Sequence, residues 1–137
     1  MGENKRSHLV MIQKIIDRLS QHSFLIKGWS VTLVSAMFAL AAQNANLVFI
    51  YLAYFPPILF WILDSYFLWQ EKLYRALYNH VRLANERDID FSLDASIFRD
   101  SIPGWSHTLA TKTMLLFHGP LIILILIVTI IALFVSK

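Results

Sequence analysis

Three ionisable residues lie at or within the ends of the most apolar stretches of the sequence: Lys27, Asp64 and His118. Asp64 and His118 each fall about six residues, or roughly 9 Å of helix, inside an expected membrane span. Lys27 lies at the end of another span and can extend its ammonium toward water. Ionisable groups at such depth are rare, and they pair or mark an ion or proton path. We expect the three to share one layer, as a structural Asp64–Lys27 pair or as a gate, a proton-sensitive switch or an ion path.

A second group of carboxylates lies in one polar segment: Asp88, Asp90, Asp94 and Asp100. Its start resembles a calcium-binding loop of the D-x-D-x-S type. Such a loop needs glycine at its sixth position and a bidentate glutamate at its twelfth, where this chain has Leu93 and Arg99. We therefore predict a solvated acidic loop and no metal site. Polar and apolar residues alternate over residues 88–94, which suggests an extended segment.

The remaining residues offer little for catalysis. The five histidines show none of the spacings of zinc enzymes, and the chain has no cysteine and only four glycines. Thiolate catalysis, cysteine-based metal sites and disulfides are thereby excluded. The sequence predicts neither an enzyme nor a bound cofactor.

Composition indicates a membrane protein. Hydrophobic residues make up 57% of the 137 residues and charged residues 15%, against about 25% charged in soluble domains. A small soluble domain needs a largely polar surface because its surface-to-volume ratio is high. The excess apolar surface should therefore face lipid.

The chain is long enough for three spans. Residues 28–63 and 113–136 carry no charge, and one span needs about 20 residues. The polar residues 43–46 divide the first stretch, so the predicted fold is an all-α membrane protein with three transmembrane helices, an N-terminal amphipathic helix and a cytoplasmic extension of span two. The expected segments are a cytoplasmic amphipathic helix (1–23), a transmembrane hairpin (24–69), a cytoplasmic helix and loop (70–112) and the third span (113–137).

Basic residues predict the orientation. Eleven of the 12 lysines and arginines precede span one or lie between spans two and three, and only Lys137 lies at the other side. Positively charged loops remain in the cytoplasm. We expect an inner-membrane protein with its N-terminus in the cytoplasm and its C-terminus outside.

Two apolar stripes lie on the expected cytoplasmic helices. One is on the N-terminal helix, which could lie on the inner leaflet or dock a partner. The other comprises Leu73, Leu77 and Val81. Its expected cover is the N-terminal helix, another subunit or a cytoplasmic protein partner.

Span one carries small residues at three- and four-residue spacing: Gly28, Thr32, Ser35, Ala36 and Ala39. Such a face allows helices to approach closely. It could pack against span two within the chain, form an oligomer seam or line a pore. Span three is almost wholly apolar and is expected to face lipid.

Residues 24–30 (FLIKGWS) and 60–78 (FWILDSYFLWQEKLYRALY) resemble a family of small bacterial multi-span membrane proteins of uncharacterised function, loosely associated with antiviral defence loci. The resemblance covers about the first 80 residues. It implies a membrane-damaging effector and gives no role to any position. Its pattern includes Lys27, Trp29, Asp64, Glu71 and Arg75.

The function predicted from these features is a small oligomeric inner-membrane effector or channel-like subunit that responds to a cytoplasmic signal, with antiviral defence as the implied setting. The alternative is a membrane-tethered adaptor that recruits a cytoplasmic partner without conducting. The expected partners are the lipid bilayer and either further copies of the chain or a cytoplasmic protein, with no nucleic acid.

Overall fold

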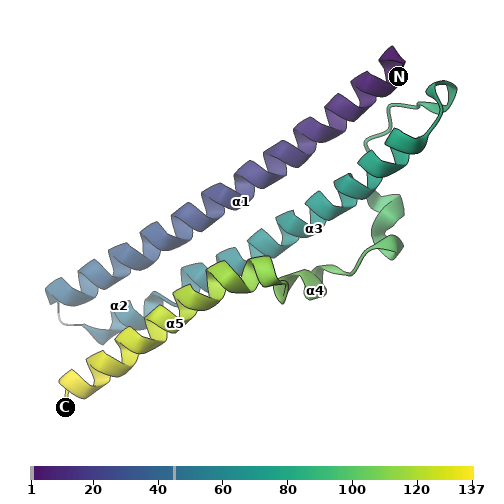
Figure 1. Cartoon of the computed structure of the whole chain (residues 1–137). Coiled ribbons are helices and arrows are strands. Elements are labelled where there is room, and N and C mark those ends of the chain that lie inside the picture. The colour runs from purple at the N-terminus through teal and green to yellow at the C-terminus, as the bar shows by residue number, and fades with distance from the viewer. Residues whose placement is uncertain (1, 45) are drawn as a thin grey trace.

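The computed structural model describes residues 2–44 and 46–137. Its elements are α1 (Glu3–Asn44), α2 (Leu47–Leu52), α3 (Phe55–Leu83), η1 (Glu86–Asp88), η2 (Ser96–Ser101), α4 (Trp105–Leu109) and α5 (Lys112–Val135). Figure 1 shows how the α-helices are arranged. The described residues include no β-strand. Three segments are long and apolar enough to cross a membrane: α1, Leu47–Leu83 and α5. The predicted all-helical class with three candidate spans is confirmed.

α1 is a single helix of 42 residues, about 63 Å long at 1.5 Å per residue. This is about twice the roughly 30 Å thickness of the hydrocarbon core, so the apolar half alone is long enough for a span. The structure differs here from the expectation of a separate amphipathic helix on the leaflet. The N-terminal half is collinear with the first span, with no break at residue 23.

α1 and α3 run side by side, and the N-terminus lies at the opposite end of the molecule from the C-terminus (Figure 1). We call the end where α1 begins and α3 finishes the basic end. There, Leu9, Ile12 and Ile16 of α1 are buried against an apolar stripe on α3. That stripe consists of Leu73, Leu77 and Val81, exposed by 2%, 3% and 4%. The structure therefore places the predicted docking stripe under the N-terminal half of α1.

The segment after α3 holds the start of α1 in place. The Glu86 carboxylate accepts hydrogen bonds from the backbone amides of Asn4 (2.9 Å) and Lys5 (3.2 Å). A negative charge at this position also complements the positive end of the helix dipole. Farther along, His8 Nε2 lies 2.7 Å from the Ser92 carbonyl oxygen. Two contacts thus fasten the N-terminal half of α1 to the segment between α3 and α4.

Residues 89–95 are irregular and not paired with a strand. Phe91 has a φ of 55°, which is uncommon for a residue other than glycine, and its ring lies 5.6 Å from that of His8. Asp94 accepts hydrogen bonds from the Ser96 hydroxyl (2.5 Å) and amide (2.9 Å). These bonds lower the pKa of Asp94, the hydroxyl bond most strongly.

The second span is broken near its start. Asn46 caps α2 through a bond from the Val48 amide to its side-chain oxygen (3.0 Å), and α2 ends before Ala53. α3 then begins with Pro56 and Pro57 in its first turn, where proline is tolerated because those amides have no helical partner. From there α3 runs unbroken into the basic end, as expected for a span with a polar extension.

Candidate functional site

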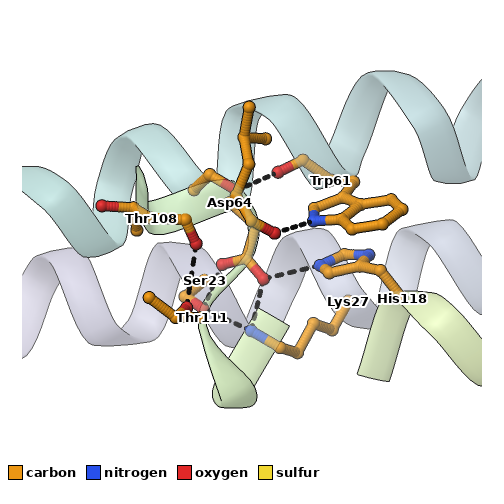
Figure 2. A network of polar contacts seen from close by, with 9 residues as sticks. Ser23, Lys27, Trp61, Asp64, Thr108, Thr111 and His118 are labelled. Carbon is orange, nitrogen blue, oxygen red and sulfur yellow. Dashed lines mark hydrogen bonds and ion pairs between the residues drawn. The ribbon is translucent and has the colours of Figure 1, made fainter. Parts of the chain in front are cut away.

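A fully buried carboxylate lies within the candidate spans: that of Asp64 on α3, which is 0% exposed. Its Oδ1 accepts a hydrogen bond from the Ser23 hydroxyl. Its Oδ2 lies 2.5 Å from Lys27 Nζ and 2.8 Å from His118 Nε2. Figure 2 shows the four side chains converging from α1, α3 and α5. The structure thus brings together the three ionisable residues that were expected in one layer. We call these three residues and Ser23 the polar cluster.

α1 supplies two members of this cluster because Ser23 and Lys27 are four residues apart and share a helix face. Lys27 Nζ also donates to the Ser23 hydroxyl at 2.6 Å, so both side chains are directed at Asp64. Sequence reasoning missed Ser23. The available signal was its spacing from Lys27, but an isolated serine near a span boundary is too common to select on spacing alone.

His118 is held between aromatic rings. The Trp61 indole stacks on its imidazole with centroids 5.8 Å apart and planes 6° apart, and Phe117 meets it edge-on at 5.0 Å. Trp61 Nε1 in turn donates to the Leu109 carbonyl at 3.0 Å, which joins α4 to the arrangement. These contacts fix the imidazole plane so that Nε2 points at Asp64.

The hydrogen-bond roles at His118 follow from its acceptor. An ionised carboxylate only accepts, so Nε2 carries the proton and donates to Asp64. Nδ1 is then the free nitrogen, and it is buried without a partner among the described residues. A neutral imidazole leaves one ammonium and one carboxylate, so the cluster has no net charge. Buried charges are tolerated when paired and hydrogen-bonded in this way.

Exposure within the cluster is uneven. The side chains of Asp64 and His118 are 0% exposed, whereas that of Lys27 is 21% exposed. Lys27 Nζ also lies 5.7 Å from the centre of the Phe117 ring, a distance that allows a cation–π contact. Of the three ionisable groups in the cluster, only that of Lys27 is therefore partly exposed at the surface of the helices.

The small-residue face of α1 lies elsewhere. Its members are all exposed: Gly28, Thr32, Ser35, Ala36 and Ala39. A Cβ atom built on Gly28 would meet nothing within 4 Å in the described part of the chain. The face therefore does not pack against the second span. The Thr32 and Ser35 hydroxyls bond to carbonyls of their own helix, those of Gly28 (2.8 Å) and Val31 (2.9 Å).

α5 is not wholly lipid-facing, contrary to the sequence expectation. Leu121 and Ile125 pack with Val34 of α1 and Ala53, and Ile125 is 0% exposed. Tyr54 Oη and Thr129 Oγ1 also lie 2.7 Å apart, which gives α5 a second polar contact with the other helices. In residues 2–44 and 46–137, no three histidine or acidic side chains are placed to hold a metal ion.

Comparison with protein-family models, curated proteins and solved structures finds no match. The polar cluster and the exposed face of α1 are therefore the features on which a function can be proposed.

Proposed function

We propose that the chain is a subunit of a small oligomeric inner-membrane effector, channel-like in form, that responds to a signal on its cytoplasmic side. A setting in antiviral defence follows from the resemblance of residues 24–30 and 60–78 to the bacterial family. The observation that carries the proposal is the cluster of Lys27, Asp64 and His118, which connects three candidate spans through one buried carboxylate. The proposal includes no catalysis, metal or cofactor.

A buried ionic link between helices suits a responsive membrane protein. The hydrogen-bond partners of Asp64 in the described chain are Ser23, Lys27 and His118, none of which is acidic. The single negative charge of Asp64 therefore balances one positive charge, and adding or removing a charge with all groups in place leaves an unbalanced ion in an apolar layer. An unbalanced buried charge raises the free energy of the folded chain by several kilocalories per mole, which is enough to change how helices pack. Local charge changes acting on packed elements are a common basis of switching.

The exposed face of α1 supports assembly. Its small residues allow a neighbouring helix to approach closely, and the chain itself does not cover them. We infer that a second copy of α1 covers this face. The adjoining exposed side chains on α1 are Phe24 and Leu25, which are 78% and 56% exposed and would extend the contact.

The adaptor is the alternative, and one observation favours it. The Thr32 and Ser35 hydroxyls are bonded to their own helix, so this face offers little polarity to a wide aqueous pore. An adaptor needs an accessible docking surface, but Leu73, Leu77 and Val81 are covered by α1. A partner would therefore have to displace α1 or bind elsewhere at the basic end.

Ion flux distinguishes the two functions. The full chain would be placed in liposomes loaded with a fluorescent ion indicator, with protein-free liposomes as the control. A channel-like subunit should release ions above the control rate. An assembled chain without flux would contradict channel activity and support the adaptor.

Replacing Ala36 with Leu should weaken assembly by about 1–3 kcal/mol, the usual effect of overpacking a close contact. Ile123→Phe is the control, because it also enlarges an exposed apolar side chain but on α5. Chemical cross-linking of the full chain in nanodiscs gives the fraction of assembled protein. Equal loss in both variants would mean that α1 does not form the seam.

The proposed orientation is tested with two single-cysteine variants. Asn44 and Asn85 are both exposed. Asn44 is the last residue of α1, and Asn85 follows the end of α3, at the opposite end of the pair of helices. With the chain in sealed cells, a membrane-impermeant thiol reagent should label Asn44→Cys from outside and Asn85→Cys only after lysis. Labelling of both from one side would contradict three spans.

A further inference from the structure

Two spans place their donors on the same oxygen. Lys27 Nζ and His118 Nε2 approach Asp64 Oδ2 at 2.5 Å and 2.8 Å, while Oδ1 is bonded to Ser23. One carboxylate carries one negative charge and balances one cation. In an apolar layer a surplus charge is strongly unfavourable. Asp64 can therefore serve as counterion to an ammonium or to an imidazolium, but not to both.

The other groups around His118 do not change this balance of charge, because none of them carries a further negative charge. α1 contributes Lys27, α3 contributes Asp64 and the uncharged Trp61, and α5 itself contributes Phe117. α4 contributes Thr108, which is buried and bonded to the Gly104 carbonyl (3.5 Å), while its His107 is exposed. Within the described chain, the charge that balances a protonated His118 can come only from Asp64.

We propose that Lys27 and His118 compete for Asp64, so that a proton bound by His118 releases Lys27 from the cluster. The proton adds to the free Nδ1 of the imidazole, and Nε2–H stays bonded to Asp64. Lys27 keeps its ammonium protons and withdraws toward the basic end. The neutral pair of Lys27 and Asp64 is thereby exchanged for a neutral pair of His118 and Asp64.

The exposures decide which cation leaves. His118 is 0% exposed and enclosed by Trp61 and Phe117, whereas Lys27 is 21% exposed and has a long flexible stem. Such a stem can carry its ammonium to the membrane boundary. An imidazolium stacked on the Trp61 indole also gains a cation–π contact. Lys27 is therefore the group that moves.

The exchange would act on α1. Lys27 and Ser23 are the α1 residues bonded to Asp64 of α3, and loss of the Lys27 bond loosens that link, whereas the apolar core at the basic end stays intact. The inference rests on the proposed function, in which the proton would be the signal or a condition for response. The exchange itself needs neither assembly nor ion flux.

The test is nuclear magnetic resonance of the full chain in nanodiscs, with ¹⁵N-labelled histidine and lysine, from about pH 8 to pH 5, where imidazoles change charge. At high pH, His118 should show one protonated and one free nitrogen. As the pH falls, Nδ1 should gain a proton, and Lys27 Nζ should change from an ion-paired to a hydrated ammonium with the same midpoint. The ratio of the two states should change by at most about tenfold per pH unit, as one proton requires.

Two variants make the result decisive. His118→Gln keeps an N–H donor but cannot take the proton, so Lys27 should stay paired throughout this pH range. His107→Gln removes an exposed histidine outside the cluster and should leave both transitions unchanged. The exchange is excluded if His118 does not titrate, if it titrates while Lys27 stays paired, or if Lys27 still responds in His118→Gln. Assembly and flux assays report separately on the proposed function.

Discussion

Replacing Lys27 with Met and His118 with Phe in the same chain should destabilise it by about 3–5 kcal/mol, the usual effect of leaving a buried charge unpaired. Asp64 would retain only the Ser23 hydroxyl, and it is 0% exposed. It must then stay ionised without a counterion or take up a proton. Either outcome reduces the free energy of unfolding at neutral pH.

Each single replacement should have a smaller effect, because Lys27, or a His118 that takes up a proton, can still balance Asp64. The effect of the double replacement should therefore exceed the sum of the two singles, by about 0.5–3 kcal/mol for groups in direct contact. Adding Asp64→Asn should restore part of the lost stability, since no carboxylate is then left unpaired. The measurement is the free energy of unfolding in mixed detergent micelles. Strictly additive effects would show that Lys27 and His118 act independently.

Replacing Ile12 with Ala should destabilise the chain by about 2–5 kcal/mol, as expected for truncating a fully buried aliphatic side chain. Ile12 is 0% exposed and packs with the stripe of Leu73, Leu77 and Val81. The loss should fall on the N-terminal half of α1. This core holds that half against α3, and the contacts of Glu86 and His8 hold it against the segment that follows α3.

Val10→Ala is the matched control, because Val10 lies on the same helix and is 48% exposed. Hydrogen exchange of the full chain in detergent should show faster exchange in residues 3–22 for Ile12→Ala and little change for Val10→Ala. Similar behaviour of the two variants would mean that the covering of the α3 stripe by α1 contributes little to stability.

The meeting of the three ionisable residues was the part of the site that the sequence could predict. A charge in an apolar stretch is unfavourable wherever it lies, so counting residues from the span ends was enough to place Lys27, Asp64 and His118 in one layer. Ser23 could not be predicted in this way, because an uncharged hydroxyl near a span end has many possible partners. Its role depends on how α1 is rotated about its axis relative to α3.

The partners of helix faces could not be read from the sequence. A periodic pattern shows that residues such as Leu77 share a face, but several apolar surfaces would cover it equally well. The small residues around Ala36 likewise indicate a capacity for close approach without naming the neighbour. In α5 almost every side chain is apolar, so nothing in the pattern distinguishes buried Ile125 from exposed Ile123.

The hairpin and the break in the second span illustrate a similar limit. The structure shows α2 ending before Ala53 and α3 starting at Phe55, with Pro56 and Pro57 in the first turn of α3. Proline forbids particular backbone hydrogen bonds, so it locates a disturbance. Whether the helix bends or stops depends on the packing of α2 against α1 and α5, which the local sequence does not contain.

The central claim, that this chain works as an assembly of identical subunits in a membrane, is tested most directly by counting chains. Native mass spectrometry of the full chain released from nanodiscs gives that number without labels. The proposal predicts one defined number greater than one, reduced by Ala36→Leu and unchanged by Ile123→Phe. A single chain per particle at every protein-to-lipid ratio would contradict it.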